Sequence, residues 1–224
     1  METAKNLTTP EAALKIMGSE NFISLDEALK VFPYKKDGLT GYDTVPFSKE
    51  LLYHCSEEGR PFILFPAFCK LGNVSLTINC LHDLLNYSHY DLFHPFPRDP
   101  VMQKSSFIYR ATCEPRWYLI SKKVMEVDEV KQFCASNELS YKNFKAAPAV
   151  VYVYAWILFK LAKKRTLFLE NLLYCQDNYS DRKNAPTMVY LSFKSGKVAA
   201  GYWFPKKGGI NELGIVPSVD QYTE

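Results

Sequence analysis

The feature that most constrains the fold is the apolar segment "APAVVYVYAWILFKLAKKR" at residues 147–165. Pro148 suits the first position of a helix, and the basic residues that end the segment favour the carboxyl end of a helix dipole. Its apolar run is about 14 residues long, whereas a helix that crosses a bilayer needs about 20. We therefore predict a buried helix at 148–164, although the β-branched and aromatic residues leave a strand as the alternative.

The segments around this helix favour β-strands in the second half of the chain. The strand candidates are "SFIYR", "RWYLIS", "ENLLYCQD", "PTMVYLSF" and "KVAAGYWF", with "ELGIVPS" as a further short one. The last two long candidates are joined by "KSG", a short connection that contains glycine and is typical of a hairpin. A modest helix is expected near 127–135.

The first half of the chain predicts short helices with clear caps. Thr9 precedes Pro10, Ser24 and Glu27 form a capping-box pattern, and Ser48 begins the next helical segment. "RPFILFPAF" predicts a buried strand, and "LTINCLHDLLN" predicts a helix that Thr77 caps. A connection rich in proline and aromatic residues then follows at 87–105.

These elements predict an α+β fold, in which an antiparallel sheet from the C-terminal half packs on the central apolar helix at 148–164. The domain organisation that we predict is a smaller, mainly helical N-terminal region at 1–86, the connection at 87–105, and an α+β C-terminal region at 106–224.

Composition limits the protein class more than the function. The chain is rich in aromatic residues, with 15 Phe, 15 Tyr and 3 Trp. Side chains of this size either fill a hydrophobic core or form a surface that binds a partner. The net charge of +3 is well below that of a dedicated nucleic-acid-binding domain. The first residues lack a secretory h-region, and the six cysteines contain no CxxC pair, so we expect a cytoplasmic protein with reduced thiols. We expect no cofactor and no association with a membrane.

Three of the four histidines lie close together in "HDLLNYSHYDLFHPFPRDP". His82, His89 and His94 are separated by seven and five residues, which matches no common zinc-ligand pattern. We predict that they do not share a metal ion. The alternative is a catalytic metal site completed by Asp91.

Other catalytic patterns are weak. The chain has no GxSxG elbow, no Walker A sequence and no GxGxxG after a strand. Glu170, Asp177 and Asp181 lie on or beside one predicted strand, and such carboxylates hold a divalent ion in nucleases. Glu170 and Asp177 are seven positions apart, however, and would face opposite sides of a regular strand.

Two basic segments form the binding site that we predict. "KLAKKR" ends the apolar helix, and "PKKGG" follows the last long strand candidate, so that lysines lie beside aromatic rings that can stack on bases. The candidate binding residues are Lys163, Lys164, Arg165, Tyr202, Trp203, Lys206 and Lys207.

Four blocks, "KIMGSENFIS", "RWYLISKK", "LFLENLLYCQD" and "ELGIVPS", together resemble a family of uncharacterised bacterial proteins with no known activity. The resemblance implies a bacterial, intracellular protein and transfers no functional residue. In that family an acidic turn containing glycine follows the cysteine and aspartate. Here the sequence is "DNYSDRKN", which lacks the glycine and brings in Arg182 and Lys183, and this weakens any cation-binding role.

The sequence therefore favours a non-enzymatic interaction protein that binds a protein partner or itself. The alternatives are a metal-dependent hydrolase or nuclease, and a nucleic-acid-binding protein without catalysis.

Overall fold

In the computed structural model, the apolar segment forms the central helix α8 (Ala149–Lys163). Every side chain from Ala149 to Phe159 is buried, so the helix is covered on all sides rather than along one stripe. The prediction of a buried helix is confirmed. Among the residues that the structure describes, no helix is long and apolar enough to cross a membrane.

The described parts of the chain are residues 7–33, 39–57, 62–87, 106–168, 172–179, 187–193, 197–203, 214–215 and 217–219. The helices are α1 (Pro10–Met17), α2 (Leu25–Val31), α3 (Lys49–Ser56), α4 (Ile78–Tyr87), α6 (Ser106–Tyr109), α7 (Val127–Ser136), the 3₁₀ turn η1 (Tyr141–Asn143) and α8. The strands are β1 (Phe62–Ala67), β2 (Lys70–Leu71), β3 (Val74–Ser75), β4 (Arg116–Ser121), β5 (Phe144–Ala146), β6 (Leu172–Tyr179), β7 (Thr187–Ser192), β8 (Ala199–Trp203), β9 (Gly214–Ile215) and β10 (Pro217–Val219). The fold is α+β, as predicted.

The first sheet has the strand order β1-β4-β10-β5, and all of its pairs are antiparallel. Its longest pair runs from Phe62 opposite Ser121 to Ala67 opposite Arg116. Because β1 precedes the predicted connection and β4 follows it, the two predicted regions contribute to one sheet. The outer edge of β1 is bridged at Leu64, which exchanges backbone hydrogen bonds with Asn21 and Ile23.

The second sheet has the order β8-β7-β6-β9. The pair β7–β8 is antiparallel, as the hairpin pattern predicted. The pair β6–β7 is also antiparallel, whereas β9 lies parallel to β6. The predicted strand "ELGIVPS" is therefore divided, because β9 joins this sheet and β10 joins the first. The buried face of β6 and β7 carries Leu173, Cys175, Val189 and Leu191.

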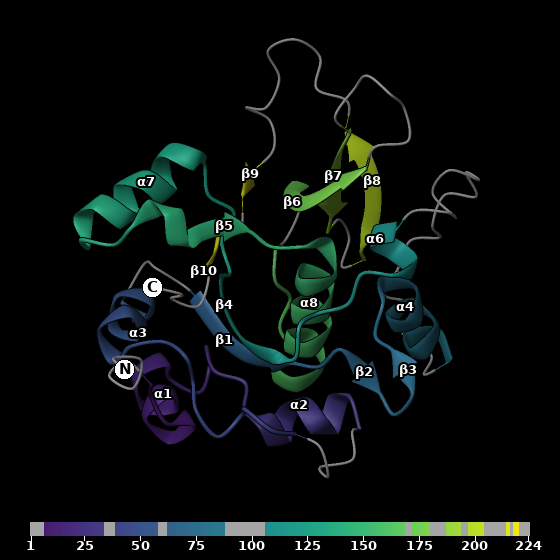
Figure 1. Cartoon of the computed structure of the whole chain (residues 1–224), viewed down its shortest axis with the longest axis horizontal. Coiled ribbons are helices and arrows are strands. Elements are labelled where there is room, and N and C mark those ends of the chain that lie inside the picture. The colour runs from purple at the N-terminus through teal and green to yellow at the C-terminus, as the bar shows by residue number, and fades with distance from the viewer. Residues whose placement is uncertain are drawn as a thin grey trace.

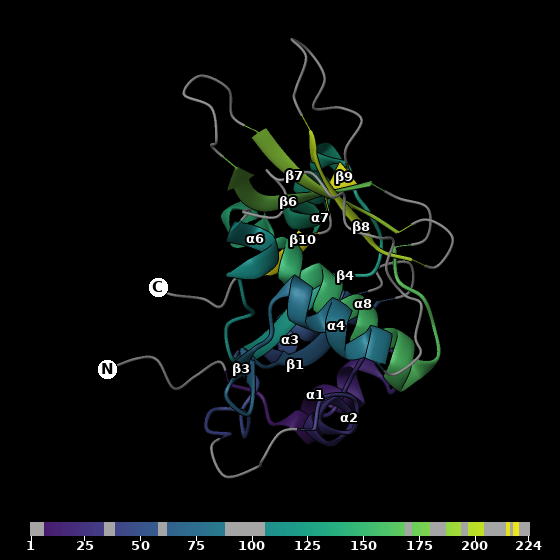
Figure 2. The same cartoon turned by 90° about the vertical axis from the view of Figure 1, so that its right-hand side faces the viewer.

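Helix α8 lies in the middle of the molecule, with the second sheet above it and α2 below it in Figure 1. Figure 2 shows the same layers from the side, with α4 beside α8. Aromatic rings connect α8 to its neighbours: Tyr154 stacks on Phe32 with ring centroids 4.8 Å apart, and Trp156 lies 5.9 Å from Phe193. The core is thus built around one helix that contacts both sheets.

One predicted strand is wrong. "SFIYR" forms the short helix α6, which buries Phe107 and Ile108 against α4 and α8. The strand β4, which follows it in the chain, pairs with β1 on one side and with β10, at Leu119 and Ile120, on the other. Residues 88–105 of the predicted connection lie outside the described residues.

Candidate functional site

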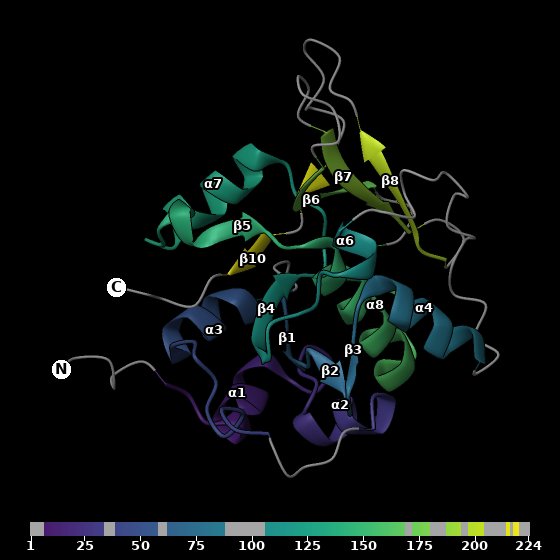
Figure 3. The same ribbon diagram turned by 45° about the vertical axis from the view of Figure 1, so that its right-hand side comes forward.

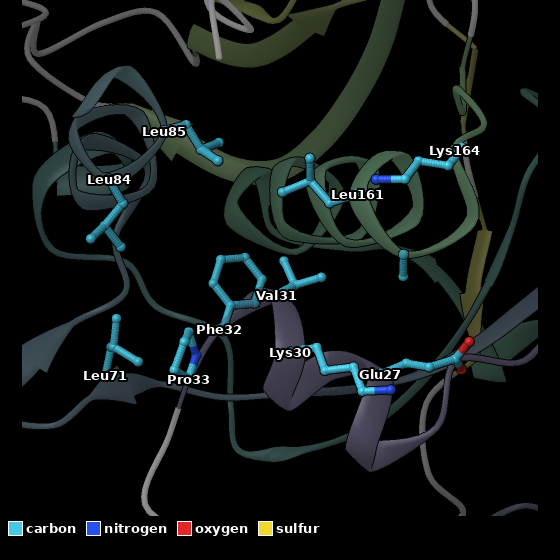
Figure 4. Close-up of a pocket in the computed structure, with 11 residues that line it drawn as sticks. Glu27, Lys30, Val31, Phe32, Pro33, Leu71, Leu84, Leu85, Leu161 and Lys164 are labelled. Atoms are coloured by element: carbon cyan, nitrogen blue, oxygen red, sulfur yellow. The ribbon is translucent and has the colours of Figure 1, made fainter. Parts of the chain in front are cut away.

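A pocket of about 600 Å³ opens between α2, α4 and the carboxyl end of α8. Its apolar lining comes from the three helices and from β2, and Figure 4 shows the lining side chains. Figure 3 shows α2, β2, α4 and α8 on the same side of the molecule. The apolar lining residues are Val31, Phe32, Pro33, Leu71, Leu84, Leu85, Leu161 and Ala162. A concave, mostly apolar surface with few polar groups is the usual form of a binding site.

Local sequence signals set the ends of α2, the helix on one side of this pocket. Ser24 caps the helix by accepting a hydrogen bond from the Glu27 amide at 3.2 Å, and Glu27 accepts one from the Ser24 amide at 2.8 Å. The helix ends at Val31, before Phe32 and Pro33. Phe32 is buried and its ring stacks on Tyr154, so the ring that lines the pocket is held by the core.

Three charged side chains also line the pocket: Glu27, Lys30 and Lys164. Lys163 donates a hydrogen bond to Glu27 at 2.6 Å. Burial raises the pKa of the Glu27 carboxyl, but the contacts with Lys163 and Ser24 outweigh burial and hold that pKa below its ordinary value. Glu27 is therefore an ionised carboxylate with a counterion, and the pocket has two further ammonium groups.

The predicted basic cluster is described only in part. Lys163 is paired with Glu27, and Arg165 is paired with Glu20 at 2.7 Å, whereas Lys164 is exposed and lines the pocket. Tyr202 and Trp203 lie in β8, but their side chains are outside the described residues, as are Lys206 and Lys207. Of the three described basic residues, Lys163 and Arg165 are therefore engaged in ion pairs with other residues of the chain, and Lys164 lies beside the pocket.

Asp177 caps the central helix. Its carboxylate accepts a hydrogen bond from the Ala149 amide, the first of α8, at 2.5 Å. Burial raises the pKa of Asp177, and this hydrogen bond lowers it by less. Asp177 lies where the register of β6 against β7 shifts, between Tyr174 and Asn178, and its contact with the Ala149 amide places its carboxylate at the start of α8. Glu170 and Asp181, the other predicted carboxylates, lie outside the described residues.

The histidine cluster is also described only in part. His82 lies on α4, where its Nδ1 is 3.0 Å from Asp83 Oδ1. His89 and His94 are outside the described residues, so the prediction that the three do not share a metal ion stays a prediction. Within the described ranges, no group of three or more His, Cys, Asp or Glu side chains is arranged to hold a metal ion.

A second pocket, of about 590 Å³, lies where β5 meets β6. Its lining includes Tyr141 and Tyr174 together with Lys142, Lys145 and Gln176. Tyr141 is 40% exposed. Aromatic rings beside lysines suit nucleic-acid bases and phosphates, but these are not the residues that the sequence predicted for such a site.

Of the residues that line the pocket between α2, α4 and α8, only Lys164 was predicted to be a binding residue. Leu84 and Leu85 belong to the predicted apolar stripe of α4, and nothing in that stripe distinguishes a side chain that lines a cavity from one that fills the core. Comparisons with protein-family models, curated proteins and solved structures give no match for this chain.

Proposed function

We propose that this protein is a non-enzymatic binding protein, and that the pocket between α2, α4 and α8 accepts an apolar segment of a protein partner. The observation that carries the proposal is the convergence of apolar side chains from three helices on one open cavity. Apolar and aromatic anchors that fill such a cavity supply most of the energy of a protein interface. We keep the bacterial cytoplasm as the expected compartment, where the thiols stay reduced.

A pull-down with matched variants tests the proposal. Leu161→Asp places a charge in the pocket, whereas Leu14→Asp places one on an exposed site of α1, where Leu14 is 40% exposed. Wild-type protein and the Leu14 variant should retain the same partner, and the Leu161 variant should lose it. Light scattering after size exclusion distinguishes self-association from a different partner. Equal retention by both variants, or a monomer that retains nothing, would contradict the proposal.

The second candidate function is binding of single-stranded nucleic acid at the pocket between β5 and β6. Its support is the pair Tyr141 and Tyr174 beside Lys142 and Lys145. Base stacking on aromatic rings and phosphate contacts with lysines give binding that weakens with salt. Fluorescence anisotropy with a labelled oligonucleotide should show salt-dependent binding that Tyr141→Ala weakens. Binding that is independent of salt, or none, would remove this candidate.

A metal-dependent hydrolase was the other alternative, and Asp177 was its best described residue. The contact of Asp177 with the Ala149 amide gives this carboxylate a structural role, so we do not propose hydrolysis at this position.

A further inference from the structure

We infer that the partner segment is acidic and amphipathic, with large apolar side chains in the pocket between α2, α4 and α8 and carboxylates beside Lys30 and Lys164. This inference rests on the proposed function and specifies the chemistry of the partner. It depends on the charges around the pocket rather than on its apolar lining alone.

The apolar part of the pocket suits large side chains. Leu84 comes from α4, Leu161 from α8 and Phe32 from the end of α2, and Figure 4 shows them around one space. Val31, Leu71, Leu84 and Leu161 are only half-buried in the protein alone. Covering them removes further apolar surface from water, at about 25 cal/mol for each Å².

The charge balance of the pocket favours an anion. Glu27 is neutralised by Lys163 and also accepts the Ser24 amide, so its two carboxylate oxygens are both engaged. Lys30 and Lys164 line the same cavity, and neither forms an ion pair with any residue in the described part of the chain. Two ammonium groups beside an apolar surface are complementary to carboxylates next to apolar side chains.

The positions of the two lysines favour a peptide over a ligand with a single anionic head. Lys30 lies on the α2 side of the pocket, and Lys164 lies at the end of α8 in a left-handed conformation with φ of 57°. Figure 4 shows them on different sides of the cavity. A peptide that carries several acids along an apolar face can meet both, as amphipathic helices do in apolar grooves.

Selection from a random-peptide phage library tests this inference without a known partner. The wild-type protein is the target, and the Leu161→Asp variant is used to remove phage that bind elsewhere. Affinities of the selected peptides are then measured by fluorescence polarisation for wild type, for Lys30→Glu with Lys164→Glu, and for a control with the same change in charge, Lys15→Glu with Lys123→Glu. Lys15 and Lys123 are exposed and do not line the pocket. Circular dichroism verifies the fold of each variant.

The expected pool is enriched in Asp and Glu next to Leu, Ile, Phe or Trp. The Lys30 and Lys164 reversal should weaken binding about tenfold, because two charge contacts at a partly desolvated rim are lost, while the control stays near wild type. Binding should also weaken as salt is added.

Three results overturn the inference, and they are distinguishable from one another. A pool of neutral or basic apolar peptides that still depends on Leu161 contradicts the acidic partner and leaves the proposed function intact. No enrichment over the Leu161 variant contradicts the proposed function as well. A concentration-dependent dimer that is lost in the Leu161 variant assigns the pocket to a second copy of the chain.

Discussion

The replacement of Asp177 distinguishes a helix cap from a catalytic carboxylate. Asp177→Ala removes the acceptor of the Ala149 amide, and Ala149 is fully buried, so its N–H cannot turn to water instead. Loss of a helix cap costs about 0.5–2 kcal/mol, and a buried donor without a partner costs about 1–3 kcal/mol. We expect a loss of about 2 kcal/mol in the free energy of unfolding, which lowers Tm by about 4–8 °C for a chain of this length.

Asp177→Asn supplies the matched control, because its amide oxygen still accepts the Ala149 N–H. The variant loses the favourable interaction of the carboxylate with the helix dipole, about 0.3–1 kcal/mol, but it also removes the cost of burying a charge. We expect its stability to lie within about 1 kcal/mol of wild type. Urea unfolding followed by circular dichroism gives both differences from the midpoint and slope.

The two variants also differ in pH dependence. Burial raises the pKa of Asp177 in the folded protein, so the folded state holds this proton more tightly than the unfolded chain does. The wild type therefore loses stability relative to Asp177→Asn as pH rises from the unfolded value of about 3.9 through the raised folded value. If Asp177→Asn were as unstable as Asp177→Ala, or if neither variant lost stability, the assignment of Asp177 as a cap would be wrong.

Three further predictions concern local features. Ser24→Ala should lower the free energy of unfolding by about 1 kcal/mol and Tm by about 2–4 °C in calorimetry, because it removes the cap of α2; an unchanged Tm would argue against the cap. Glu27→Gln should cost about 0.5–1 kcal/mol at neutral pH, and because the folded pKa of Glu27 is lowered, this difference should disappear as pH falls through that pKa; a loss that persists in acid would refute the ion pair as its cause. Mass mapping after brief thiol labelling of the native protein should find Cys69 and Cys80 modified first, since both are partly exposed, and early labelling of any buried cysteine would contradict the structure. The cysteines expected to resist are Cys55, Cys113, Cys134 and Cys175; burial raises the pKa of Cys134 to about 11.

Local signals were sufficient wherever the interacting groups are close in sequence. The caps at Thr9 and Ser24 join residues three positions apart, and both are present as the pattern predicts. Periodicity and length identified α8 and the strands β4, β6, β7 and β8. These features depend on the backbone of a single segment, so a single sequence contains the information.

Pairings over long distances in sequence were not predictable in this way. The Glu27–Lys163 contact that shapes the pocket joins residues 136 positions apart. The "SFIYR" segment was predicted as a strand but is helical, because it packs Phe107 and Ile108 against α4 and α8, and a single sequence does not show these distant contacts. Asp177 had a partial signal in the sequence, since it follows the apolar residues Leu173 and Cys175 at a spacing of two, and a buried carboxylate needs a donor. The register shift of β6 between Tyr174 and Asn178 was not predictable from this spacing. The sequence does not identify that donor as the Ala149 amide.

The position of β10 determines when the first sheet can be completed during synthesis of the chain. This strand, at 217–219, separates β4 from β5 in the first sheet, although the ribosome makes it after every other described strand of that sheet. Until it emerges, the nascent chain presents the unpaired edges of β4 and β5 at the same time, and open edges of this kind invite pairing between chains. We expect the emerging polypeptide to depend on chaperones until residue 219 has left the ribosome.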